Sequence, residues 1–253
     1  MTADLVARAA SLVAQVRERR PRVHCITNTV VQELTANVLL AAGAIPSMTT
    51  SAEEIGYFVS GADVLLVNLG TLDKERRDAI EIALEVARDD RIPWILDPVL
   101  IDRSEPRAEL ARLIALQEPR VVRGNAAEFG ALMQTEPTPE ALDKFALDHI
   151  TVAACTGAVD LVTSGAKRVR IESGHPYMAQ VTGIGCAESA LVAAMVAVED
   201  DEFIAAAAGL LMTSIAGEMA AEIAQGPGSF AVALIDAIAK IDAETIAAKA
   251  RVR

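Results

Sequence analysis

The residues best suited to chemistry are Gly183, Gly185 and Cys186, in the run Val181-Thr182-Gly183-Ile184-Gly185-Cys186 just before a long apolar stretch. Two glycines let a backbone turn its N–H groups inward, and the N-terminus of a following helix adds partial positive charge. A turn of this kind binds anions, and a phosphoryl group in particular. Cys186 should then lie in the first helical turn, where we expect its thiol pKa to fall below about 8.5. The alternative is an ordinary loop-to-helix turn with a buried structural cysteine.

Polar residues also follow a series of short apolar runs; they are Asn28, Thr49, Asn68, Asp97, Arg123 and Thr156. If each run is a strand of one parallel sheet, these side chains meet at its carboxyl edge, where open α/β sheets bind their ligands. Helix capping is an alternative explanation for Asn28, Ser51, Thr71 and Asn125 taken singly. It explains Asp97 and Arg123 poorly, because neither directly precedes an expected helix. The six strand ends together predict a site.

Several common site types do not fit this chain. The sequence contains no GxxxxGK[ST] motif, and the GxGxxA match over 226–231 follows an expected helix rather than a strand. No two histidines have the spacing of metal ligands, which argues against a zinc site. His24 and Cys25 are adjacent on an expected strand and point to opposite faces, so they form no nucleophile–base pair. A cysteine-dependent hydrolase therefore lacks its histidine.

The elements that position these residues alternate between strand and helix. Val64–Val67 is continuously apolar, as expected for a strand buried on both faces. The capping-box spacing predicts helix starts at Ser51 to Glu54 and at Asn125 to Glu128, and Gly43 should end a helix over 31–42. The expected strands are 23–27, 44–48, 64–69, 94–96, 120–122 and 150–154.

The C-terminal part departs from this alternation. Runs over 160–163 and 167–172 flank Ser164-Gly165-Ala166 and predict a hairpin at a sheet edge. Helices are expected over 186–198, 201–224 and 229–248, the last two separated by Gly226-Pro227-Gly228. We find no linker and no internal repeat. The expectation is one domain over 1–253, an α/β fold with a central, mostly parallel sheet flanked by helices and a helical C-terminal third.

Composition limits the partners and the compartment. The 253 residues carry 23 basic and 35 acidic side chains, a formal net charge of −12, which argues against nucleic acid and anionic membranes. The uncharged stretch 203–217 is shorter than the roughly 20 residues of a membrane span, so we expect a buried helix. The first twenty residues show helical apolar spacing with interspersed charges, which predicts a helix rather than a signal peptide. Three cysteines without a CxxC pair favour the cytoplasm.

Longer runs of the sequence resemble hydroxyethylthiazole kinases of thiamine salvage, which are members of the ribokinase-like superfamily. The similar runs follow the family's order from about residue 21 to residue 235; they are 24–28, 68–72, 96–99, 123–128, 156–160, 174–176, 181–186 and 226–230. The resemblance implies transfer of the γ-phosphoryl group of ATP to the primary hydroxyl of 4-methyl-5-(2-hydroxyethyl)thiazole, with Mg²⁺. It also implies a homotrimer whose active sites lie between neighbouring subunits.

The resemblance further assigns roles to single residues. Met48 and Gly183 would contact the thiazole, with Asn28 nearby. Arg123 and Thr156 would contact ATP, while Asp97 and Glu128 would act through Mg²⁺ and the phosphates. Cys186 takes the position where most of the superfamily has an aspartate as general base, with Gly183 and Gly185 forming the anion hole.

The sequence differs from the family pattern at three places. A glycine-rich GVGAT stretch is replaced by Leu100–Ser104, Ile184 is bulkier than the usual residue, and Glu188 replaces an apolar residue. We expect Glu188 to oppose ionisation of the Cys186 thiol. The changed loop leaves open a related small-alcohol kinase, and a weakly active paralogue that binds thiazole or nucleotide is a further alternative.

Overall fold

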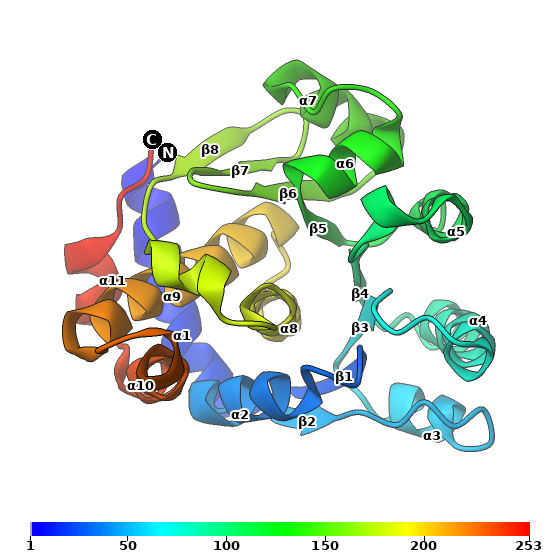
Figure 1. Ribbon diagram of the computed structural model, residues 1–253, viewed down its shortest axis with the longest axis horizontal. Coiled ribbons are helices and arrows are strands. Elements are labelled where there is room, and N and C mark those ends of the chain that lie inside the picture. Colours follow the sequence, from blue (N-terminus) through cyan, green and yellow to red (C-terminus); the bar gives the residue numbers. More distant parts are fainter. Residues whose placement is uncertain (1) are drawn as a thin grey trace.

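The computed structural model describes residues 2–253, and its centre is an eight-stranded sheet covered by helices on both faces (Figure 1). The strand order is β2-β1-β3-β4-β5-β6-β7-β8. The first six strands pair in parallel, and β7 and β8 add an antiparallel hairpin at one edge, so the predicted fold class and hairpin are confirmed. The strands are β1 (Arg22–Ile26), β2 (Ile45–Ser47), β3 (Val64–Asn68), β4 (Trp94–Asp97), β5 (Val121–Asn125), β6 (Val152–Thr156), β7 (Asp160–Thr163) and β8 (Arg168–Ile171).

Two groups of helices enclose the sheet. One face carries α1 (Thr2–Arg19), α2 (Gln32–Ala42), α8 (Ile184–Val196), α9 (Glu202–Ile223), α10 (Pro227–Lys240) and α11 (Ala243–Lys249). The other face carries α3 (Ile55–Ser60), α4 (Lys74–Asp89), α5 (Glu105–Ala115), α6 (Ala126–Met133) and α7 (Pro139–Asp148), as Figure 1 shows. Every residue of β3 is buried, because a strand covered on both faces has no solvent side.

The long apolar helix α9 lies within the protein core. Its length and composition would suffice for a membrane span, but 89% of its most apolar window is buried. The helix packs against α1, α8 and α10. The prediction of a buried helix is confirmed. Asp201 is the N-cap of α9, and its side chain accepts hydrogen bonds from the Phe203 and Ile204 N–H groups.

Two central strands extend further toward their carboxyl ends than the sequence suggested. We expected strands over 120–122 and 150–154, whereas β5 ends at Asn125 and β6 at Thr156. The two strands continue to pair through Gly124 with Cys155 and Asn125 with Thr156. Backbone hydrogen bonding therefore carries the sheet past the apolar run and into the polar residues. Ile150, assigned to a strand, is instead an exposed turn residue with φ of 50°.

Helix ends confirm some of the capping predictions and correct others. Gly43 ends α2 in a left-handed conformation, and Asn125 with Glu128 forms the predicted capping box of α6. The Ser51 prediction is wrong, since α3 begins at Ile55 without a side-chain cap. The expected helix over 229–248 is two helices, because Asp242 accepts a hydrogen bond from the Thr245 N–H and starts a new one.

Candidate active site

A cavity of about 780 Å³ opens at the carboxyl ends of β5 and β6, beside the N-terminus of α8. Six of the nine predicted site residues line it; they are Arg123, Glu128, Thr156, Gly183, Gly185 and Cys186. Asn28 contacts the lining, since it donates to the Cys186 Sγ at 3.5 Å, whereas Asp97 is fully buried and accepts at 2.8 Å from Ser189 of α8, which is not a lining residue. Met48 is half-buried against the apolar core and is not part of the cavity lining. Of these six residues, the strand-end rule predicted Arg123 and Thr156, and the glycine-containing turn predicted Gly183, Gly185 and Cys186; one cavity brings the two groups together.

The N-terminus of α8 presents backbone donors to this cavity. Gly183 precedes the helix with φ of 94°, a left-handed conformation that favours glycine. A side chain there would also meet Val31, since an added Cβ would lie 2.6 Å from its Cγ1. The first N–H bonded within the helix is that of Ala187, to the Gly183 carbonyl. Within residues 2–253, the N–H groups of Ile184, Gly185 and Cys186 have no hydrogen-bond acceptor, so they are free to bind an anion.

The second glycine has a different purpose from the one its spacing suggested. Gly185 lies inside the helix and needs no left-handed backbone. An added Cβ would lie 2.8 Å from the Nη1 atom of Arg123. Gly185 therefore makes room for the guanidinium at the helix N-terminus.

Arg123 is held in the cavity wall by an acidic partner. Its Nη2 donates to the Oε2 of Glu188 at 2.5 Å, and both side chains are buried. Burial raises the pKa of Glu188 to about 7, although the guanidinium opposes that rise. The neighbouring carboxylates hold the pKa of Arg123 above its ordinary value against the effect of burial. Arg123 thus remains charged beside the free N–H groups.

Glu128 combines a capping role with its place in the cavity. Its Oε2 accepts a hydrogen bond from the Asn125 N–H at 2.8 Å, and its Oε1 accepts one from the Leu100 N–H at 3.0 Å. The capping explanation for Asn125 is therefore correct, and Glu128 also ties α6 to the loop after β4. Leu100, where the family pattern is glycine-rich, is left-handed with φ of 58°.

Asp97 is fully buried at the end of β4. Its Oδ2 accepts hydrogen bonds from Asn68 at 2.7 Å and from Ser189 at 2.8 Å, whereas its Oδ1 has no partner within residues 2–253. Burial raises the pKa of Asp97 to about 7, and Glu128 adds to the rise while Arg123 opposes it. Ser189 was missed as a site residue; its spacing of three from Cys186 on one helix could have indicated it.

The predicted ionisation of Cys186 is wrong. The side chain does lie in the first turn of α8, but burial, followed by the nearby Asp97 carboxylate, raises the pKa of the thiol to about 12. Desolvation outweighs the helix N-terminus here. The expectation for Glu188 also fails, because that carboxylate pairs with Arg123. Cys186 is a neutral thiol at neutral pH.

A further acidic residue was not predicted as part of the site. Asp160 lines the cavity, is buried, and accepts a hydrogen bond from the Gly157 N–H at 2.9 Å. Burial raises its pKa to about 6, and Arg123 opposes that rise. Its position at the start of the edge hairpin carried no sign of this role.

The carboxylates could support a divalent cation that is held mainly by other groups. No cluster of three or more His, Cys, Asp or Glu side chains suited to a metal occurs in residues 2–253. Asp97 has a buried oxygen without a partner within residues 2–253, and Glu128 lines the cavity. Mg²⁺ typically keeps several waters and takes one or two carboxylates together with substrate phosphates. This donor set fits such an ion.

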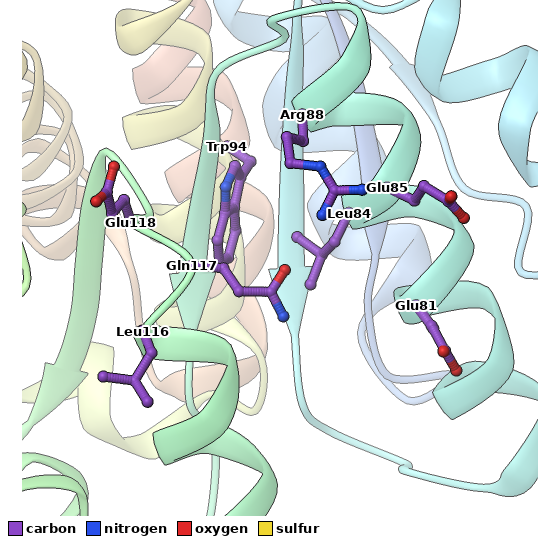
Figure 2. Close-up of a pocket in the computed structure, with 8 residues that line it drawn as sticks. All are labelled: Glu81, Leu84, Glu85, Arg88, Trp94, Leu116, Gln117 and Glu118. Atoms are coloured by element: carbon purple, nitrogen blue, oxygen red, sulfur yellow. The ribbon is translucent and has the colours of Figure 1, made fainter.

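A second hollow, of about 620 Å³, lies at the opposite end of the sheet. Figure 2 shows Trp94 between the side chains of α4 and the segment Leu116–Glu118. This hollow lies next to Trp94, the first residue of β4, away from the strand ends where α/β sheets bind ligands. It contains no predicted site residue, and we do not regard it as the active site.

The fold and the site define a class of protein. A ribokinase-like superfamily protein from Enterococcus faecalis superposes with a TM-score of 0.69, covering 95% of each chain at 15% identity, which shows a shared fold. The chain therefore has a ribokinase-like fold, and its cavity combines a free helix N-terminus with a buried arginine, both of which favour an anion.

More similar proteins identify the family. The model of the hydroxyethylthiazole kinase family matches residues 13–244, and the chain belongs to that family. A probable hydroxyethylthiazole kinase of Agrobacterium fabrum is 46% identical over 97% of this chain and 95% of its own length. The hydroxyethylthiazole kinase of Granulibacter bethesdensis is 42% identical over 98% and 95%. The structure of the Pyrococcus horikoshii protein superposes with a TM-score of 0.92 at 37% identity, covering 97% of this chain and 98% of that one. The chain thus has hydroxyethylthiazole kinase activity, in thiamine metabolism.

Proposed function

We propose that phosphoryl transfer from ATP to the alcohol of hydroxyethylthiazole takes place at the N-terminus of α8. The observation that carries this proposal is the row of unpaired N–H groups at Ile184, Gly185 and Cys186, which opens onto the cavity. These groups bind the transferred phosphoryl, whose equatorial oxygens carry negative charge in the transition state. Because the donors are fixed by the helix, they need no rearrangement when that charge develops.

ATP extends from this point along Arg123 and Thr156. Both residues line the cavity, and the Thr156 hydroxyl lies 3.4 Å from the Gly124 carbonyl at the end of β5. The guanidinium supplies positive charge to the phosphates, and the hydroxyl supplies a further polar contact. Mg²⁺, when bound with ATP, would neutralise charge on the phosphates. Asp97 and Glu128 would hold this ion through the phosphates and water.

The alcohol lies beside Cys186, with Gly183, Asn28 and Met48 contributing to its binding. The Cys186 thiol is neutral, so it orients the hydroxyl rather than removing its proton at the start. A loose transition state needs little early removal of that proton. The Asn28 side chain fixes the position of the thiol through its contact with Sγ.

The chain acts as a single kinase domain in a cytoplasmic homotrimer, with each active site near a neighbouring subunit. Large apolar side chains near the free edge of the sheet support this arrangement. Tyr57 is 83% exposed, Phe58 and Ile45 are each 41% exposed, and the Phe58 ring lies 5.7 Å from that of His24 on β1. Met48 follows directly after β2 at this same edge, so a neighbouring subunit could bring it to the thiazole. Light scattering should give the mass of three chains.

Substitution of Arg123 tests the ATP assignment. Arg123→Ala should raise the KM for ATP at least about tenfold and change the KM for the alcohol much less, because the guanidinium contacts phosphate. Arg120→Ala is the matched control, since Arg120 precedes the same strand but pairs with Glu202 outside the cavity. Both constants should be measured with saturating Mg²⁺ and again during a Mg²⁺ titration. An Arg123→Ala enzyme with the parent's KM for ATP would refute the assignment.

A further inference from the structure

Glu188 is the one acidic residue of α8 and lies one turn beyond the free N–H groups. It is 4% exposed, lines the cavity, and replaces an apolar residue of the family pattern. Its Oε2 accepts from Nη2 of Arg123 at 2.5 Å, while Nη1 of the same guanidinium lies against Gly185. The carboxylate therefore holds one nitrogen of the guanidinium while the whole group lies against Gly185 in the first turn of α8.

The location of the guanidinium is electrostatically unfavourable without this partner. A helix N-terminus carries a partial positive charge of about half an elementary charge, which repels a cation placed there. Arg123 is also 9% exposed, so water cannot compensate for the repulsion. Glu188 supplies a negative charge within hydrogen-bond distance of the guanidinium. The ion pair thereby offsets the repulsion and keeps two kinds of anion-binding donor close together.

We propose that Glu188 is a positioning residue that holds Arg123 at the N-terminus of α8, so that one phosphate group is bound by the guanidinium and the helix N–H groups together. The inference rests on the proposed role of Arg123 toward ATP. It predicts that Glu188 assists nucleotide binding, although a carboxylate in a phosphate site would by itself repel the nucleotide. These two effects change the KM for ATP in opposite directions, which makes them separable.

The test compares Glu188→Leu, Glu188→Gln and the double variant with Arg123→Ala. Glu188→Leu restores an apolar residue and should raise the KM for ATP about tenfold, with the KM for hydroxyethylthiazole within about twofold of the parent. Glu188→Gln keeps an oxygen that accepts from Arg123, so its KM for ATP should fall between those of the parent and Glu188→Leu. In the Arg123→Ala background, Glu188→Leu should not change the KM for ATP any further, because Glu188 acts on nucleotide binding only through Arg123.

Controls separate this idea from loss of fold and from failure of the ATP assignment. Asp143→Asn removes an acidic partner of Arg168 away from the cavity and should leave both KM values unchanged. Thermal unfolding should show that each variant is folded, and nucleotide binding measured by calorimetry with a non-hydrolysable ATP analogue should follow the KM values. An unchanged or lower KM for ATP in folded Glu188→Leu overturns the inference when Arg123→Ala raises that KM. If Arg123→Ala has no effect, the ATP assignment itself has failed.

Discussion

Replacement of Asp97 by asparagine should stabilise the protein at alkaline pH. Burial raises the pKa of this carboxyl from 3.8 to about 7, so the folded protein keeps a proton that the unfolded chain has lost over that interval. Stability rises with pH only where the unfolded state binds more protons. Here the folded state binds more, and Asp97 therefore lowers the free energy of unfolding as pH rises from about 4 to about 7. Above that pH range the full loss in the free energy of unfolding persists, and below it this loss disappears.

The size of the effect follows from the same shift. One pKa unit corresponds to about 1.4 kcal/mol, so a rise of about three units costs about 4 kcal/mol near pH 8. Near pH 5 the pH is only about one unit above the pKa of this carboxyl in the unfolded chain. The buried carboxyl then lowers the free energy of unfolding by about 2 kcal/mol. Asparagine keeps an oxygen for the hydrogen bonds from Asn68 and Ser189 and carries no charge to desolvate. The gain from Asp97→Asn should therefore grow by about 2 kcal/mol between pH 5 and pH 8.

The assay is urea unfolding of parent and Asp97→Asn near pH 5, 6.5 and 8, with chelator present and nucleotide absent. Asp73→Asn is the matched control, because Asp73 is an exposed cap of α4 whose pKa is lowered by the Arg76 N–H. Its stabilising effect is lost only as pH falls toward that lowered pKa, so its substitution should show no trend over the same range. A stability difference for Asp97→Asn that is independent of pH would refute the reasoning. Phosphoryl transfer should fall in this variant whatever its stability.

Substitutions at three further positions test the site. Gly185→Ala should raise the KM for ATP because its Cβ displaces Arg123, with thermal unfolding showing that the variant is folded; a normal KM would remove Gly185 from the site. Glu128→Gln should lose about 1 kcal/mol in urea unfolding, because the amide oxygen can accept only one of the two hydrogen bonds from the Asn125 and Leu100 N–H groups, and should require more Mg²⁺ in a rate titration. An unchanged Mg²⁺ requirement would leave Glu128 a structural residue. Cys186→Ala should lower kcat by less than about a hundredfold without shifting the rate–pH profile, and Cys186→Asp should keep activity or raise it; a profile that loses a thiol ionisation in Cys186→Ala would contradict the high pKa of the thiol.

The fold was predictable because its signals are local. The continuous apolar run of β3, the Gly43 stop and the Asn125–Glu128 capping box each depend on neighbours in the sequence. Some errors occur where a distant strand decides the outcome, as at Asn125 and Thr156, which pair with each other past the apolar runs, whereas those at Ser51 and Asp242 concern local helix caps. Sequence periodicity has no information about such a partner.

The meeting of most candidate residues at one cavity was predictable, and their ionisation was less so. Arg123 reaches the cavity because β5 ends there, and Gly183 and Cys186 reach it because the N-terminus of α8 lies beside that strand end. The ionisation of Cys186 was wrong because it depends on burial, and the expectation for Glu188 failed because that residue's partner lies 65 positions away in the chain. Desolvation is a property of the packed interior, so spacing alone cannot supply it.

Charge in the cavity explains how an acidic protein accommodates a triphosphate. Asp97, Glu128, Asp160 and Glu188 surround Arg123, which is the single lysine or arginine among the cavity-lining residues in the described chain. Counted formally, this set would repel a nucleotide. Burial raises the pKa of Asp97 to about 7 and that of Asp160 to about 6, so part of the formal negative charge is neutralised by protons near neutral pH, whereas Glu188 keeps its charge in the pair with Arg123. The negative charge that remains lies beside the free N–H groups of α8. A divalent cation arriving with the phosphates would favour the ionised form of the carboxylates. The formal net charge of −12 therefore describes the surface toward macromolecules and says little about this site.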